Sequence, residues 1–192
     1  MKKILCVLLI LSMLFAFAAC ANEPATNGSI TDSGDKTVTS NESDVNYEAP
    51  EGFIMYQNKE MAFAYPSDWT QIDESTFANA DNTRSVTVKV EEETTFYAEL
   101  DTIKYRDYIR PVYESEGKKL MSMVVGQRTK DGVGFTYITQ TYQVEGIQGE
   151  IYQNIYAFNT KDKTYVITIT QPNGFERDDT LGEKIYETII VK

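Results

Sequence analysis

The sequence predicts an α+β domain, in which helices pack on an antiparallel β-sheet meander. Two observations predict this class. Four long segments between residues 120 and 170 have the composition of strands, and only short, turn-rich links separate them. Residues 101–116 and 180–191 place apolar side chains three or four positions apart, as amphipathic helices do. The order of strands, helix, four strands and helix is typical of an α+β fold built on one antiparallel sheet.

The first part of the domain is expected to consist of short strands. Residues 53–56 and 61–65 flank a polar tetrapeptide, and this pattern predicts a β-hairpin. Residues 66–69 are expected to turn the chain, because a proline cannot continue a central strand. A third short strand is predicted at residues 74–78. Residues 84–90 alternate between apolar and polar types, which predicts a strand with one face made of Val86, Val88 and Val90.

A helix is predicted over residues 101–116, where apolar residues recur at helical spacing. Pro111 is the weak point of this helix, because an interior proline removes one hydrogen bond and kinks or stops a helix. Gly117 is suited to the C-terminal cap. The helix is therefore expected to end at about this glycine.

The second half is expected to form the meander and a final helix. Short links join consecutive antiparallel neighbours. In the final helix, Thr180 and Glu183 have the spacing of a capping box. Its inner stripe is predicted to contain Leu181, Ile185, Thr188 and Ile189. The four predicted strands are residues 120–129, 133–144, 150–159 and 165–170.

The N-terminal 20 residues have the pattern of an export signal. Lys2 and Lys3 precede an apolar run over residues 4–19, and small residues lead to Cys20. A cysteine in this place resembles the lipobox of bacterial lipoproteins, which implies that Cys20 is lipidated and anchors the chain to the membrane outside the cytoplasm. A retained transmembrane helix and a plain secretory signal are the alternatives. The apolar run is shorter than the roughly 20 residues that a spanning helix needs.

The chain is expected to divide into three parts: a signal peptide at residues 1–19, a lipidated tether at 20–50 and a domain at 51–192. The tether is polar and acidic, and such a segment buries too little apolar surface to offset the entropy of ordering. It is therefore expected to be disordered and to hold the domain away from the membrane.

The composition excludes several classes of function. The chain has 18 basic and 29 acidic residues and a net charge of −11. Without residues 1–19 it has 16 basic and 29 acidic residues, a net charge of −13. This charge argues against nucleic-acid binding. The chain has no histidine, and its two cysteines are Cys6 and Cys20. Residues 51–192 therefore offer neither an imidazole base for catalytic triads nor the preferred ligands of zinc.

The segment Phe63-Ala64-Tyr65-Pro66-Ser67-Asp68-Trp69, followed by strands, a helix, a meander and a last helix, resembles the PsbP-like family. That family includes the PsbP subunit of photosystem II, a eukaryotic Ran-binding protein and many bacterial lipoproteins. The resemblance extends over most of residues 52–192 and implies an α-β-α sandwich with a non-catalytic binding or adaptor role. The roles of PsbP in manganese or calcium handling are not carried over, because the metal-site residues cannot be matched.

Aromatic residues are the candidate binding residues of this domain. Trp69, the only tryptophan, is expected to lie in the core, with a ligand platform as the alternative. Tyrosines on the predicted meander alternate with Thr, Gln and Asn, a composition that suits polar recognition of a protein or a glycan. The β-propensity of Tyr and Thr also accounts for this pattern. The tyrosine candidates are Tyr137, Tyr142, Tyr152 and Tyr156.

The acidic residues give a second, weaker hypothesis. Glu91, Glu92 and Glu93 could supply oxygen ligands to Ca²⁺, but consecutive strand residues point to opposite faces, which favours a solvated strand end. Asp178 and Asp179 are expected to cap the final helix. The favoured prediction is a lipid-anchored, non-catalytic binding or adaptor module with no cofactor or metal and with an envelope protein or glycan as partner. The alternative is a carboxylate-based envelope hydrolase or a Ca²⁺-binding protein.

Overall fold

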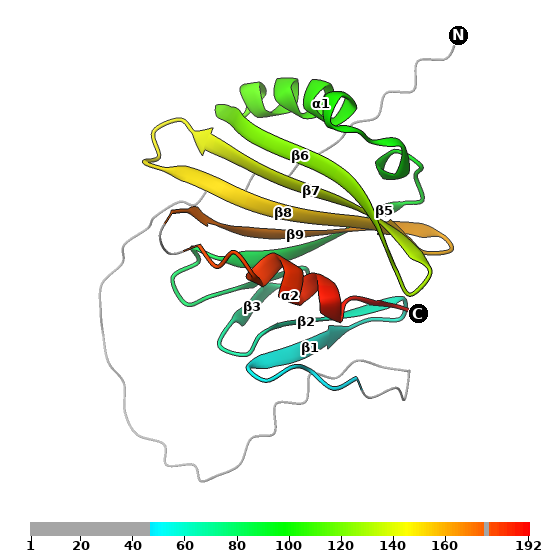
Figure 1. Ribbon diagram of the computed structural model, residues 1–192. Helices are drawn as coiled ribbons and strands as arrows, with labels where there is room; N and C mark the ends of the chain where they lie inside the picture. Colours follow the sequence, from blue (N-terminus) through cyan, green and yellow to red (C-terminus); the bar gives the residue numbers. More distant parts are fainter. Residues whose placement is uncertain (1–46, 175–176) are drawn as a thin grey trace, which may run out of the picture. The chain divides into compact units, whose positions relative to one another are not determined.

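The computed structural model describes residues 47–174 and 177–192, and within them an α+β domain with two antiparallel sheets (Figure 1). Two α-helices and a short 3₁₀ helix, η1 (Tyr97–Glu99), accompany the strands. The α-helices are α1 (Thr102–Ser115) and α2 (Leu181–Thr188). The strands are β1 (Phe53–Gln57), β2 (Met61–Pro66), β3 (Thr70–Asp73), β4 (Thr76–Ala78), β5 (Ser85–Glu92), β6 (Lys118–Lys130), β7 (Val133–Val144), β8 (Glu150–Asn159), β9 (Lys163–Asn173) and β10 (Ile190–Val191).

The large sheet has seven strands in the order β3-β4-β5-β9-β8-β7-β6. Its strands β6 to β9 form the predicted meander, and β5 pairs with β9 over eight residues. Two residues, Asp131 and Gly132, connect β6 to β7, and both have positive φ angles (51° and 81°). This is the backbone that the tightest hairpins require, because its twist matches that of the flanking strands.

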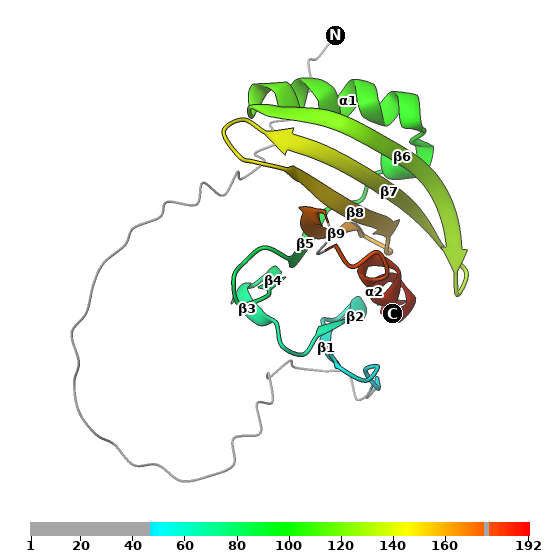
Figure 2. The same cartoon turned by 60° about the vertical axis from the view of Figure 1, so that its left-hand side comes forward.

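The two faces of the large sheet are covered by different elements. Helix α1 lies over one face, and α2 lies with the small sheet β1-β2-β10 on the opposite side (Figures 1 and 2). Alternate residues of each strand therefore belong to different cores. On β9, for example, Ile167 belongs to the core on the α2 side and Val166 to the core on the α1 side. The layers are those of an α-β-α sandwich.

Capping and packing explain where the helices begin and end. The Asp101 carboxylate accepts hydrogen bonds from the backbone N–H groups of Ile103 and Lys104, both at 2.8 Å, and so caps α1. The helix does not stop at Pro111 but continues to Ser115. Gly117 follows with a φ of 66°, which a glycine adopts without a steric penalty. The helix predicted over residues 101–116 is thus confirmed, and Pro111 does not interrupt it.

Two expectations about the sheets and the last helix were wrong, and strand β3 was missed. The short strand predicted at residues 74–78 is present as β4, but its hairpin partner β3 was not predicted. The first hairpin does not join the large sheet; it pairs with β10 in a second sheet, so there are two sheets and not one. Helix α2 ends at Thr188 because the chain then extends as β10 beside β2. Two-residue strands have too little sequence pattern to be recognised.

The predicted capping box of α2 is not formed. Thr180 makes no side-chain cap, and the Asp178 carboxylate instead accepts hydrogen bonds from the Thr180 backbone N–H and hydroxyl at 2.8 and 2.7 Å. Glu183 points to Arg128 of β6. At the other end of α2, the Lys130 ammonium donates to the carbonyls of Glu187 and Ile189 at 2.6 and 2.7 Å. Lys130 thereby ties the β6–β7 hairpin to this helix end.

Residues 1–46 lie outside the described part of the chain, and with them the predicted signal peptide, Cys20 and most of the predicted tether. In the part that is described, neither helix has the length and hydrophobicity that a membrane span requires.

Candidate functional site

The five predicted aromatic residues are divided between the two sides of the large sheet. Trp69 and Tyr156 are only 7% and 4% exposed and belong to the core on the α2 side. Tyr142 is buried on the α1 side, where burial raises the pKa of its hydroxyl to about 12. Tyr137 and Tyr152 are partly exposed. The structure therefore leaves two of the five candidates, Tyr137 and Tyr152, accessible.

Tyr137 and Tyr152 lie on one open surface, which we call the tyrosine face. Strand register places its members in rows across β6, β7 and β8, on the side of the sheet that α2 occupies. One row joins Val124, Thr139 and Asn154, and the next joins Ser122, Thr141 and Tyr152. Val124 is 55% exposed. We define the face by Ser122, Val124, Tyr137, Thr139, Tyr152 and Asn154.

Each tyrosine of this face has an arginine against its ring. The Arg128 guanidinium lies 4.6 Å from the ring centroid of Tyr137, and that of Arg177 lies 4.5 Å from the ring centroid of Tyr152. Arg128 also donates two hydrogen bonds to the Glu183 carboxylate, at 2.9 and 2.7 Å. These bonds raise the pKa of Arg128 and fix its position. The face thus presents rigid, amphipathic side chains with a positive charge beside each ring.

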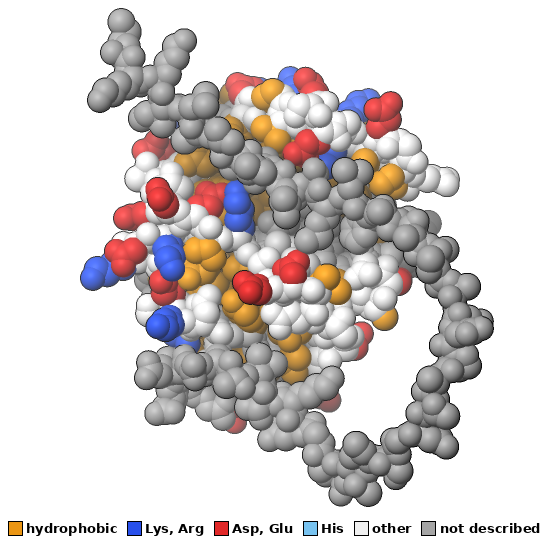
Figure 3. Space-filling model, turned by 180° about the vertical axis from the view of Figure 1, so that it is seen from behind, with side chains coloured by type: hydrophobic (Ala, Val, Ile, Leu, Met, Phe, Trp, Pro, Cys, Tyr) orange, Lys and Arg blue, Asp and Glu red, His pale blue; other side chains and the backbone are white. Residues whose placement is uncertain are grey.

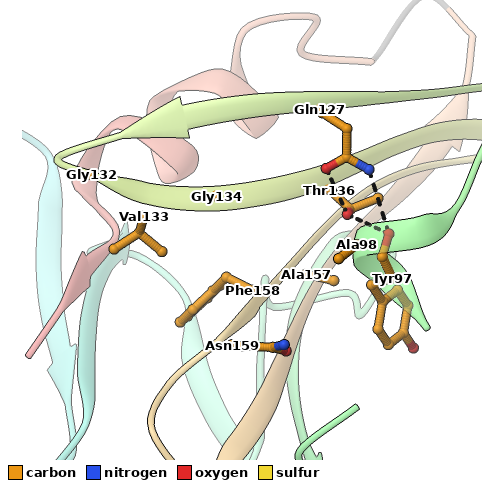
Figure 4. Close-up of a pocket in the computed structure, with 10 residues that line it drawn as sticks. All are labelled: Tyr97, Ala98, Gln127, Gly132, Val133, Gly134, Thr136, Ala157, Phe158 and Asn159. Atoms are coloured by element: carbon orange, nitrogen blue, oxygen red, sulfur yellow. Dashed lines mark hydrogen bonds between the residues drawn. The ribbon is translucent and has the colours of Figure 1, made fainter. Parts of the chain in front are cut away.

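The other side of the sheet has an open hollow of about 340 Å³ near the β6–β7 hairpin (Figure 4). Gln127 and Thr136 lie at one end of it, next to η1, and Val133 and Phe158 lie at the other. The Thr136 hydroxyl is 2.7 Å from the Tyr97 carbonyl oxygen and 3.0 Å from Gln127 Oε1. The end of the hollow beside η1 is therefore polar.

The acidic residues of the described chain are dispersed. Within residues 47–174 and 177–192, no three Asp or Glu side chains are grouped so that they could hold a metal ion. Glu91 forms an ion pair with Lys89 at 2.6 Å, at the end of β5. Figure 3 shows one side of the molecule, where acidic and basic side chains are interspersed, with apolar patches between them.

The residues around the hollow were not recognised as a site from the sequence. They come from η1, from both strands of a hairpin and from the end of β8, so only the fold brings them together. One signal was present: Gly134 lies in a segment that otherwise has the pattern of a strand, and a glycine inside a strand often marks a close approach of a ligand or of another backbone.

Comparison with known proteins supports the fold. The solution structure of cyanobacterial PsbP (CyanoP) from Synechocystis sp. PCC 6803 is similar, with a TM-score of 0.57 and 16% sequence identity, over 78% of this chain and 98% of that one. A Bacteroides thetaiotaomicron protein matches with a TM-score of 0.45 and 14% identity, over 69% of this chain and 45% of its own. A mutant of the protein Mog1 matches with a TM-score of 0.41 and 12% identity, over 71% and 96%.

No protein family model matches the sequence, and no curated protein was found to be similar to it. The similarity to CyanoP thus rests on the arrangement of the chain in space. The predicted PsbP-like α+β fold is confirmed by this match and by the two helices on mainly antiparallel sheets.

Proposed function

We propose that this protein is a lipid-anchored binding module that acts outside the cytoplasm and contacts another envelope protein through the tyrosine face. The signal pattern that ends in Cys20 supports the location. A diacylglycerol on that cysteine supplies two acyl chains, and two chains give stable anchoring where one gives only marginal binding. The polar segment after Cys20 then gives the domain room to reach a partner on the same membrane.

One observation favours the tyrosine face as the binding surface: each of its two accessible tyrosines is paired with an arginine that is itself held in place. Arg177 donates a hydrogen bond to Asn173 Oδ1 at 2.7 Å, and Arg128 is held by Glu183. Tyrosine and arginine are enriched where proteins meet, and tyrosine brings a large contact area at a low cost in conformational entropy. Side chains that are already fixed lose little further freedom on binding.

The lipid anchor is tested by mass spectrometry of the protein purified from its own membranes. We expect the mature chain to begin at Cys20 and to carry the mass of a diacylglycerol on sulfur. The variant Cys20→Ala should leave the membrane fraction or keep its signal. An N-terminus at Met1, or a free thiol at Cys20, would show that the proposed location is wrong.

The binding surface is tested by photo-crosslinking in cells. p-Benzoylphenylalanine is placed at Val124 of the tyrosine face in one strain and at Ile103 of α1 in another. The two side chains are matched in exposure, at 55% and 60%. We expect a discrete crosslinked partner only from position 124, and we expect Val124→Glu to abolish its co-purification while Ile103→Glu does not. Equal crosslinking from both positions, or none from position 124, contradicts the proposal.

A further inference from the structure

A glycine in β7 has no structural reason to be a glycine. Gly134 does not have a positive φ angle, and a Cβ atom built on it meets no atom within 4 Å. Gly126 of β6 is different, because a Cβ there would lie 2.4 Å from the ring of Tyr137. A glycine inside a strand is destabilising compared with other residues, since it loses more freedom on folding. The absent side chain of Gly134 does have one effect: it leaves the hollow open.

The amide side chains of this hollow keep unused hydrogen-bonding capacity. An amide offers two N–H donors and two acceptor sites. Asn159 uses one donor, to the Thr94 carbonyl at 3.0 Å, and one acceptor site, for the Thr164 hydroxyl at 2.8 Å. Gln127 donates only a long bond of 3.5 Å to the Tyr97 carbonyl. Its Oε1 shares the single hydroxyl hydrogen of Thr136 with that same carbonyl. Both amides are thus held in place and can still pair with a ligand.

The rest of the lining decides which ligands fit. Among the residues that the structure describes, this lining contains no Asp, Glu, Lys or Arg side chain. It includes the ionisable Tyr97, but burial raises the pKa of that hydroxyl, which keeps it neutral at physiological pH. A charged ligand would lose water here without gaining a partner of opposite charge, and this is costly. Ala98 of η1, which is exposed, supplies an apolar side chain to the lining, whereas Ala157 and Phe158 are only 1% and 2% exposed.

We propose that this hollow is a binding site for a small uncharged sugar ring, and that Gly134 keeps it open. A pyranose suits this lining, because it carries no charge and its hydroxyl groups can pair with the amides of Gln127 and Asn159. The volume of about 340 Å³ is within the range of small-molecule sites. The site lies on the α1 side of the sheet, so it is separate from the tyrosine face and does not depend on the role of that face.

The test measures binding of sugars to the full chain, purified in mild detergent, by saturation-transfer NMR and titration. The probes are two uncharged sugars, N-acetylglucosamine and methyl glucoside, and two charged ones of the same ring size, glucosamine and glucuronate. We expect at least one uncharged probe to bind and the charged probes to bind at least about tenfold more weakly. Binding of the charged sugars with equal strength, or no binding of either uncharged sugar, would overturn the proposal.

Two variants test whether the sugar binds in the hollow. Gly134→Val fills the space with a residue that strands favour, so we expect the melting temperature to be unchanged or higher while binding is lost. Gly134→Ala, a smaller change, keeps the test valid if the valine variant does not fold, and it should weaken binding in the same direction. Ile147→Thr, in the link between β7 and β8 where Ile147 is 59% exposed, is the control and should bind as the natural chain does. Undiminished binding by the folded Gly134 variants would also overturn the proposal.

Discussion

The two sides of the large sheet are packed in different ways. In the described part of the chain, the α2 side buries seventeen hydrophobic residues in its core, against nine on the α1 side, so most of the apolar burial lies under α2 and the small sheet. The α1 side instead has a polar row across β7, β8 and β9. There Gln140 Nε2 donates to the Tyr113 hydroxyl at 2.6 Å and to Gln153 Oε1 at 2.8 Å, and Gln153 donates to Thr170 at 3.1 Å.

The two sides of the sheet are therefore expected to contribute differently to the fold. One side contributes more to its stability, and the other fixes which residues pair. Apolar burial is non-directional and accumulates with area, so the α2 side is expected to contribute more to the free energy of unfolding. A buried hydrogen-bonded row contributes little net energy but is costly to break, and it fixes which residues face each other. The hollow with its open amides lies on this more polar side. Four predictions test the comparison.

The largest effect is expected from the same substitution in the two helices. Ile185 of α2 is fully buried in the larger core, and Ile109 of α1 is 7% exposed in the smaller one. We expect Ile185→Ala to lower the free energy of unfolding by about 4 kcal/mol and Ile109→Ala by about 2 kcal/mol, because a cavity in the denser core is harder to close. Urea unfolding of the full chain measures both. An equal loss of stability in the two variants, or a larger loss in Ile109→Ala, would show that the two cores do not differ in this way.

The polar row is tested by Gln140→Leu. The substitution removes the donor to the Tyr113 hydroxyl and leaves Gln153 Oε1 with only a long 3.4 Å bond from that hydroxyl, and we expect it to cost about 1–3 kcal/mol. The matched control is Gln143→Leu on the same strand, where the glutamine is only partly buried; its effect should stay within about 0.5 kcal/mol. If the leucine at position 140 is tolerated as well as that at 143, the row does not contribute to stability.

The glycines of neighbouring strands give a smaller contrast. An added methyl group at Gly126 must displace the ring of Tyr137, and since the contacted atoms are at the far end of that side chain we expect Gly126→Ala to cost only about 1–2 kcal/mol. Gly134→Ala meets nothing and should be neutral or stabilising by up to about 1 kcal/mol. Thermal unfolding of both variants measures this contrast. The proposed sugar site requires that the fold itself does not need a glycine at position 134.

How much of this could be predicted from the sequence depends on how local each feature is. The meander and both helices have their own periodic patterns, so their existence was predicted, although β6 begins two residues before and β9 continues three residues beyond the predicted limits. β10 was missed, because only pairing with β2 makes its two residues a strand. Composition identified the tyrosines as candidates, but which of them are accessible depends on what the fold packs against each side chain.

The hollow could not be predicted, because it is made by contacts between distant segments. Tyr97 and Thr136 are 39 residues apart, and their hydrogen bond exists only when η1 packs against β7. The same holds for the pair of Arg128 and Glu183, which are 55 residues apart. The capping-box pattern at Thr180 and Glu183 was therefore misleading. The Glu183 carboxylate binds the Arg128 guanidinium of β6 and not the backbone N–H of Thr180.

The smallest effect is expected where the small sheet is attached to the large one. Glu60, in the β1–β2 turn, accepts hydrogen bonds from the Tyr165 hydroxyl at 3.0 Å and the Thr160 hydroxyl at 3.1 Å, and lies 3.4 Å from Lys163 Nζ. Burial alone would raise the pKa of Glu60, but these bonds and the lysine outweigh it and lower the pKa overall. Because the folded-state pKa lies below that of the unfolded chain, ionised Glu60 stabilises the fold at neutral pH.

That contribution is lost as the pH falls from the unfolded-state pKa of Glu60 through its lower folded-state pKa. We expect Glu60→Gln to lower stability at pH 7 by less than about 1 kcal/mol, since the pair is partly exposed, and to have a smaller effect at pH 3. Tyr165→Phe, which keeps the carboxylate but removes one donor, should flatten the pH dependence less than Glu60→Gln does. Urea midpoints between pH 3 and pH 7 measure both. If Glu60→Gln leaves the pH dependence of stability unchanged, the Glu60 carboxylate does not help to hold the small sheet. The stability of the α2 side would then depend still more on its apolar contacts.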